Sequence, residues 1–147
     1  MTGVMFDTNV YRDGVYRERV SRIHSILISG VVVQELLVIA SEDQQVALIR
    51  DFRKSINDGT GFVPDHNDWI EVGRCMYRLH KKGFADFSKL AKAEVNILVR
   101  DALIARTAIR AKAVFVTLNI SDFSKIKAVF ASLKFVSAAE FFGLRPR

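Results

Sequence analysis

Short apolar runs alternate with longer amphipathic segments along the chain, and this alternation predicts strands and helices in turn. Four short, mainly apolar runs are too brief for helices and indicate strands. The predicted strands are Val4 to Phe6, Ile26 to Ile28, Ala113 to Val116 and Leu133 to Val136. Strands that alternate with helices usually pair in parallel, so the chain is predicted to form an α/β fold around a parallel sheet.

Apolar residues at intervals of three and four positions predict helices in the remaining segments. The predicted helices are Val15 to His24, Gly30 to Ala40, Ser41 to Asn57, Pro64 to Lys81, Leu90 to Ala111 and Ala138 to Phe142. Ser29 and Ser41 are predicted N-caps, and Ser41 forms a capping box with Gln44. One strand that continues through Val33 is an alternative to the second helix, because periodicity does not separate the two for short apolar runs. Polar loops are predicted after the first strand and from Thr117 to Asp122.

Four acidic residues stand where their neighbours are apolar and expected to be buried. Asp7 follows the first strand, and Asp122 closes the polar loop after the third. Glu35 interrupts the apolar run of the second helix, and Asp101 lies on the apolar side of the long helix. A buried charge costs several kcal/mol unless it is paired, protonated or coordinated, and Mg²⁺ or Mn²⁺ accepts carboxylate oxygens. The sequence therefore predicts a shared metal site beyond the carboxyl ends of the strands.

Each acid taken alone has an ordinary structural alternative. Asp7 fits a turn residue at the end of a strand, and Asp122 fits the N-cap of a following helix. Asp101 fits an ion pair with Arg106 or Arg110 on its own helix. These alternatives are independent of one another, whereas a single metal site accounts for all four acids.

The composition fits one domain with a polyanionic partner. The chain has 147 residues, 50% of them hydrophobic, and no linker divides it, so residues 1–147 are predicted to form a single domain. The 22 Lys and Arg residues exceed the 16 Asp and Glu residues, and the net charge of +6 favours a polyanion such as RNA. The candidates for phosphate contacts are Arg100, Arg106, Arg110, Lys112, Lys125 and Lys127, with a solvated basic face as the alternative.

Several other classes of protein are not supported by the sequence. The only cysteine, Cys75, excludes an internal disulfide and is predicted to be a small buried hydrophobe. His24, His66 and His80 lack the spacing of zinc ligands. The first residues lack the features of a signal peptide, and no uncharged apolar stretch approaches the ~20 residues that a membrane span requires. We therefore expect a soluble, cytoplasmic protein.

Four segments that contain the acids carry a resemblance to a known family. They are Phe6-Asp7-Thr8-Asn9, Gln34-Glu35-Leu36, Asp101-Ala102-Leu103-Ile104-Ala105 and Thr117-Leu118-Asn119-Ile120-Ser121-Asp122-Phe123. In this order and at this separation they resemble the motifs of the PIN-domain nucleases, and especially of the VapC-like toxins of bacterial toxin–antitoxin pairs. The resemblance spans nearly the whole chain, and the last two segments are its most specific part.

The resemblance implies a fold, a site, a reaction and partners. The fold is a three-layer α/β/α PIN-like fold with a central, mainly parallel sheet. The implied site consists of Asp7, Glu35, Asp101 and Asp122 as catalytic metal ligands, with Asn9, Thr117 and Asn119 orienting ligands or the scissile phosphate. The implied reaction is endonucleolytic hydrolysis of RNA with Mg²⁺ or Mn²⁺. The implied partners are an antitoxin and a second copy of the chain, either of which an exposed apolar face between Ser41 and Leu79 would receive.

Two features depart from the family pattern. Arg100 precedes the third acid where the family commonly has asparagine, and it either alters the hydrogen bonds around that acid or contacts phosphate. The segment between Asp7 and Glu35 is also shorter than is usual, so the first crossover is compact. Two other functions stay open: a catalytically silent PIN-like module that binds RNA or protein, and a nuclease acting on DNA or structured RNA outside a toxin system.

Overall fold

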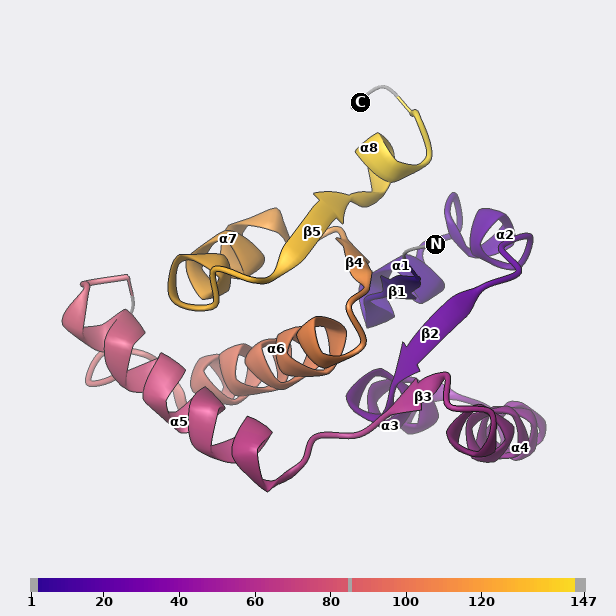
Figure 1. Cartoon of the computed structure of the whole chain (residues 1–147), viewed down its shortest axis with the longest axis horizontal. Coiled ribbons are helices and arrows are strands. Elements are labelled where there is room, and N and C mark those ends of the chain that lie inside the picture. The colour runs from indigo at the N-terminus through magenta and orange to yellow at the C-terminus, as the bar shows by residue number, and fades with distance from the viewer. Residues whose placement is uncertain (1–2, 85, 145–147) are drawn as a thin grey trace.

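The computed structural model describes residues 3–84 and 86–144, which form a five-stranded sheet with helices on both faces (Figure 1). The strands are β1 (Val4–Phe6), β2 (Ile26–Ser29), β3 (Gly61–Phe62), β4 (Val114–Thr117) and β5 (Lys134–Ser137). Their order across the sheet is β3-β2-β1-β4-β5, and every neighbouring pair is parallel. The central strand β1 thus lies between β2 and β4, with Val4 opposite both Ile26 and Val114. This arrangement confirms the predicted parallel α/β sheet.

Helices occupy most of the chain between the strands. They are α1 (Thr8–Arg12), α2 (Arg17–Val20), α3 (Gly30–Ile39), α4 (Glu42–Asn57), α5 (His66–Lys81), α6 (Lys92–Arg110), α7 (Ile120–Val129) and α8 (Ala138–Phe141). Ser29 Oγ accepts a 3.3 Å hydrogen bond from Val31 N and caps α3, so the alternative of one strand through Val33 is wrong. The predicted capping box of Ser41 and Gln44 is present at the start of α4.

The sheet separates two apolar clusters, because successive side chains of a strand point to opposite faces. Met5 and Phe115 belong to the larger cluster, which α3, α5, α6 and α7 cover. Phe6 and Val116 belong to the smaller cluster, which α1, α2 and α8 cover. The protein therefore has three layers, helix, sheet and helix, as the resemblance implied. Among the described residues, no helix combines the length and the apolar character that crossing a membrane requires.

Two segments predicted to be loops are helical. Asp7 has an extended backbone and caps α1, which begins at Thr8. Asn119 caps α7, so Asp122 lies in the first turn of a helix and not in a loop. The predicted helix from Val15 to His24 is in turn shorter, because only Arg17–Val20 is helical. The two-residue strand β3 was not predicted at all.

The helices α4 and α5, on which an exposed apolar face was predicted, pack against different elements. Figure 1 shows α4 beside α3 and β3, whereas α5 packs along α6. No residue of α4 is buried, and Val46 on its apolar face is 67% exposed. On α5, Val72 and Leu79 are buried, but Trp69 is 57% exposed. The apolar face of α4 is therefore open surface.

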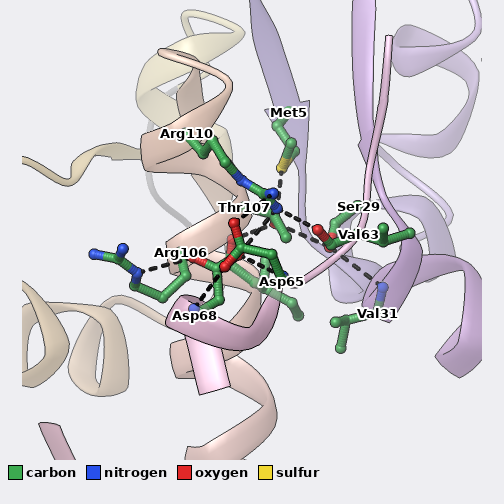
Figure 2. A network of polar contacts seen from close by, with 10 residues as sticks. Met5, Ser29, Val31, Val63, Asp65, Asp68, Arg106, Thr107 and Arg110 are labelled. Carbon is green, nitrogen blue, oxygen red and sulfur yellow. Dashed lines mark hydrogen bonds and ion pairs between the residues drawn. The ribbon is translucent and has the colours of Figure 1, made fainter. Parts of the chain in front are cut away.

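Ion pairs fasten the start of α5 to α6 (Figure 2). Asp68, which is 1% exposed, lies 3.2 Å from Arg106 Nε and 2.9 Å from Arg110 Nη2. Asp65 caps α5 and lies 3.3 Å from Arg110 Nη1. Arg106 and Arg110 therefore pair with the carboxylates at the start of α5 and are not free to contact phosphate. The alternative in which they pair with Asp101 is wrong.

Cys75 has the role that the sequence predicted. Cys75 is fully buried in the larger cluster, and its burial raises the pKa of the thiol to about 11. A thiol with a raised pKa is a poor nucleophile at neutral pH. His80 stacks on Phe87 at a centroid distance of 5.9 Å.

Candidate active site

Asp7 and Thr117 meet at the carboxyl ends of two adjacent strands. Asp7 follows β1 directly, and Thr117 is the last residue of β4, its parallel neighbour. Thr117 Oγ1 donates a 2.7 Å hydrogen bond to Asp7 Oδ2, while Thr8 N donates one of 2.8 Å to Asp7 Oδ1. Both carboxylate oxygens of Asp7, which is 4% exposed, are therefore held in place. Thr117, which the resemblance placed at the site, therefore contacts the first acid, and its role toward ligands or phosphate stays a prediction.

Glu35 reaches the same end of the sheet from α3. Thr8 Oγ1 donates a 2.6 Å hydrogen bond to Glu35 Oε2, and Thr8 is the residue next to Asp7. The compact crossover between Asp7 and Glu35 therefore does not move Glu35 away from the other acids. The predicted set did not include Thr8, although it stands inside the Asp7-Thr8-Asn9 motif.

Asn119 joins the remaining two acids. Its Nδ2 lies 3.3 Å from Asp101 Oδ2 and 3.0 Å from Asp122 Oδ2, so one amide bridges α6 and α7. Its Oδ1 accepts a 3.3 Å hydrogen bond from Asp122 N, and its own N donates to Thr117 Oγ1 at 2.9 Å. Asn119 is thus both the cap of α7 and the link between the acids. The resemblance implied that Asn119 orients ligands or the scissile phosphate, and that role stays a prediction.

Asn9 lies at the edge of this arrangement. Its Oδ1 accepts a 3.2 Å hydrogen bond from Leu118 N, which ties α1 to the segment after β4. A further hydrogen bond from its side chain lowers the pKa of Asp7. Asn9 therefore supports the loop and the first acid together.

Burial and mutual repulsion govern the electrostatics of the cluster. Burial raises the pKa of Asp7 from 3.8 to about 6, against the hydrogen bonds from Thr117 and Thr8 that lower it. Burial also raises the pKa of Asp101 to about 8, and the charges of Asp7, Asp122 and Glu35 add to that effect. All four acids are therefore close enough to interact, as a common site requires.

The acids are not arranged as a finished metal centre. Within residues 3–84 and 86–144, no three Asp, Glu, His or Cys side chains stand in a group that could hold a metal ion. Neutral donors occupy several of the carboxylate oxygens: Thr117 on Asp7, Thr8 on Glu35, and Asn119 on the other two acids. The donor set has the oxygen chemistry of a hard-cation site, but its geometry is held by internal hydrogen bonds.

A hollow of about 250 Å³ opens beside the cluster. It is lined by Thr8, Arg12, Glu35, Val38, Ile39, Ile97, Arg100 and Asp101. Two of the four acids are therefore accessible from solvent through it. Arg100 lines the hollow, in agreement with its predicted place beside the site, whereas Arg12 was not predicted.

The remaining basic candidates are less directly placed. Lys125 Nζ lies 4.0 Å from Asp122 Oδ1, at the edge of the cluster. Lys127 Nζ donates to the carbonyl oxygens of Ala131 and Leu133, which close the end of α7. Lys112, at φ 52°, occupies the left-handed turn between α6 and β4. Only Lys125 of these three has a contact with a predicted site residue.

Comparisons with known proteins identify the fold. No family model and no curated protein matches the sequence. A chain of the crystal structure of DNA-bound VapBC from Salmonella typhimurium is similar at a TM-score of 0.59 and 22% identity, covering 93% of this chain and 98% of that one. A chain of VapBC2 from Rickettsia felis, bound to a DNA fragment from their promoter, is similar at 0.55 and 21%, covering 91% and 97%. This chain therefore has the predicted PIN-like α/β/α fold.

Proposed function

We propose that this chain is a metal-dependent endoribonuclease and the toxin of a VapBC-like toxin–antitoxin pair. The observation that carries the proposal is the meeting of four acids, from four segments of the chain, at one end of a parallel sheet. Each acid accepts a hydrogen bond from a threonine or from Asn119, which orients it toward the others. The solvent-open hollow beside two of the acids, the net charge of +6 and the PIN-like fold support the same activity.

The donor set fits a hard divalent cation. Asp7, Glu35, Asp101 and Asp122 would supply carboxylate oxygens, the ligands that Mg²⁺ and Mn²⁺ take in proteins. The raised pKa of Asp101 reflects a repulsion that a cation among the carboxylates would remove. Because the described side chains form no finished metal centre, binding requires them to adjust.

The chain's own groups hold the acids for hydrolysis of the phosphodiester. When bound, a divalent cation lowers the pKa of a coordinated water and offsets negative charge on the phosphate. Thr117 and Thr8 fix the orientations of Asp7 and Glu35 through hydroxyl hydrogen bonds. Asp7 and Asp101 are only 4% and 8% exposed, so charge interactions in the site are stronger than at an open surface.

The apolar surface of the chain supports protein partners. The exposed face of α4 adjoins a hollow of about 540 Å³ whose lining includes Phe52, Val63 and Trp69. Large apolar patches on a protein surface mark interaction sites. We assign this surface to an antitoxin or to a second copy of the chain, and the similarity to chains of VapBC complexes supports the antitoxin.

Cleavage of a mixed RNA pool tests the activity. The wild type, Asp7→Asn and Asp101→Asn are compared with Mg²⁺, with Mn²⁺ and with EDTA. Asp51→Asn is the matched control, because Asp51 is an exposed acid on α4 whose ion pair with Arg50 lies outside the site. We expect metal-dependent cutting by the wild type and the control, and loss in both site variants. Cutting of DNA alone would favour the nuclease outside a toxin system.

A catalytically silent binding module is the second candidate. The absence of a finished metal centre among the described residues, and the Asn119 amide between Asp101 and Asp122, favour it. Four carboxylates in one cluster count against it, because burial and mutual repulsion make them costly to retain without a cation. The same assay separates the two: a wild type that binds RNA and cuts none under either metal is the silent module.

A further inference from the structure

The hollow beside the acids is lined by two arginines: Arg12, which was not predicted, and Arg100, a predicted candidate for a phosphate contact. Arg12 ends α1, and Arg100 lies on α6 directly before Asp101. Both line the hollow of about 250 Å³ together with Glu35 and Asp101. Arg12 stands four residues after Thr8, which lines the same hollow, so one side of α1 faces this space. Two cationic side chains from separate helices therefore share a small volume with two acids.

Neither guanidinium is engaged with those acids. Across the described residues, 3–84 and 86–144, the structure shows no ion pair and no hydrogen bond from the side chain of Arg12 or Arg100, and both residues are exposed. The contrast with Arg106 and Arg110 is direct, since these two residues of α6 are bound to Asp65 and Asp68. Arg12 and Arg100 thus keep their donors available.

A carboxylate cluster that cuts RNA has to receive a polyanion that it repels. Arginines beside the cluster reduce this repulsion, because a guanidinium presents donors in a planar fork that matches phosphate oxygens. Val38, Ile39 and Ile97 line the same hollow and are 81%, 52% and 52% exposed, so they offer apolar surface to a sugar or base. The hollow therefore offers arginine donors to the phosphate of a nucleotide and apolar side chains to its sugar or base.

We propose that Arg12 and Arg100 together bind one phosphate of the RNA strand and so position it against the acids. This inference rests on the proposed function, and it names the groups of that site that hold the substrate. Arg12 ends α1, which begins directly after Asp7, and Arg100 is next to Asp101, so a phosphate between the two arginines lies close to the acids. The pair also offsets part of the negative charge that the four carboxylates present to an approaching strand.

Each arginine also borders a second hollow, which gives the proposal a definite rival. Arg12 lines a hollow of about 390 Å³ with Leu36 and Leu48, and Arg100 lines the one of about 540 Å³ with Trp69. Contact with a protein partner is the other role that these positions allow. Of these three hollows, the one of about 250 Å³ is lined by both arginines together with Glu35 and Asp101, and it favours the phosphate.

The test is binding of a short fluorescein-labelled single-stranded RNA in EDTA, followed by fluorescence anisotropy over a series of salt concentrations. The proteins are the wild type, Arg12→Ala, Arg100→Ala and the double variant. Arg19→Ala is the matched control, because Arg19 is an exposed arginine on α2 that lines none of these hollows. Arg12→Lys and Arg100→Lys keep the charge without the fork, and circular dichroism melts of each variant establish that it is folded.

We expect each single alanine variant to weaken RNA binding about 10-fold to 100-fold, as loss of a charge-assisted contact does. The double variant should lose little more than either single variant, because the two arginines hold the same phosphate. In the double variant, the negative slope of log K, the RNA association constant, against log salt concentration should decrease in magnitude by about 0.7, the value for one phosphate of a single strand. The lysine variants should recover part of the loss, and Arg19→Ala should bind almost as the wild type does.

Other results overturn the inference. Arginine variants that bind RNA as tightly as Arg19→Ala exclude a phosphate contact. Fully additive losses with twice the change in slope exclude a shared phosphate. Normal RNA binding with loss of a copurifying antitoxin assigns the pair to the protein partner. A wild type that binds RNA through both arginines but cuts nothing under Mg²⁺ or Mn²⁺ rejects the proposed activity and leaves the phosphate site in place.

Discussion

Thr8 Oγ1 donates a 2.6 Å hydrogen bond to Oε2 of Glu35, and this contact joins α1 to α3 at the acid cluster. The hydroxyl follows Asp7 directly, so one short segment orients two acids. Thr8→Val keeps the shape of the side chain and removes the donor. We expect it to lower kcat/KM for RNA about 10-fold or more, the usual effect of losing a group that orients a metal ligand. Cleavage kinetics and the affinity for Mn²⁺ measure this change.

Thr8→Ser is the matched control, since serine keeps the hydroxyl and loses only a methyl group. It should cut RNA nearly as fast as the wild type, and both variants should melt within a few degrees of it. A valine variant that retains full activity and full Mn²⁺ affinity would show that Glu35 needs no orienting group.

The buried acids predict an unusual dependence of stability on pH. The pKa of Asp101 is raised from 3.8 to about 8 and that of Asp7 to about 6, so the folded protein holds protons that the unfolded chain releases. The stabilisation from these protons is complete below pH 3.8 and is lost as pH rises to about 8. In EDTA the Tm should therefore decrease as the pH rises from 3.8 to about 8, and Mg²⁺ should raise the Tm at pH 8.

Asp101→Asn tests the assignment of this effect to one residue. Asparagine removes the charge, so in EDTA at pH 8 the variant should melt higher than the wild type by roughly 5 °C, and Mg²⁺ should stabilise it less. Asp51→Asn, at an exposed acid of α4, should leave the pH profile unchanged. Differential scanning calorimetry in EDTA and in Mg²⁺ provides both measurements. A lower Tm for Asp101→Asn in EDTA would contradict the raised pKa.

Much of the fold follows from local patterns that the sequence displays. Ser29 and Ser41 are polar residues directly before apolar periodic segments, and each caps a helix in the structure. The sequence does not reveal that Asp7 and Asn119 also cap helices, because each heads a polar segment that equally suits a loop. Strand β3 has two residues and forms only because β2 offers its edge, so no periodic signal exists for it.

The sequence predicts those site residues whose charge is costly to bury, and it gives no signal for those of residue types that are common at any protein surface. Asp7 and Asp101 attract notice because a charge among apolar neighbours needs a reason. Thr8 and Arg12 are common surface types, and their roles depend on α1 placing them four residues apart on one side of a helix. Arg106 shows the opposite limit, since its basic character suggested phosphate and the fold instead directs it to Asp68.

Removal of the Asp68 carboxylate should destabilise the fold without removing a group of the acidic site. It is 1% exposed, and it pairs with Arg106 and Arg110 at 3.2 and 2.9 Å. Asp68→Ala leaves Arg106 without its partner and Arg110 with Asp65 alone, and it should lower the free energy of unfolding by about 3 to 5 kcal/mol. Urea denaturation measures the loss. The control Asp51→Asn removes an exposed ion pair and should change it by less than about 1 kcal/mol. Equal losses in the two variants would show that the Asp68 network contributes no more than a surface pair.

If the exposed face of α4 binds a second copy of the chain or an antitoxin, a substitution there should prevent that association and leave the fold intact. Val46 is 67% exposed on a helix with no buried residue, so Val46→Glu should change the free energy of unfolding by no more than about 0.5 kcal/mol. The same charge placed in an apolar interface is desolvated and should prevent association. Val15→Glu is the matched control, because Val15 is an exposed valine, at 50%, that lies outside α4.

Light scattering of the chain alone measures its oligomeric state, and copurification with a candidate antitoxin measures binding of that partner. Loss of the dimer alone assigns α4 to the homodimer, and loss of the antitoxin alone assigns it to that complex. If Val46→Glu retains both associations, α4 is not the interface, and the partners must use the hollow beside Trp69 or another surface.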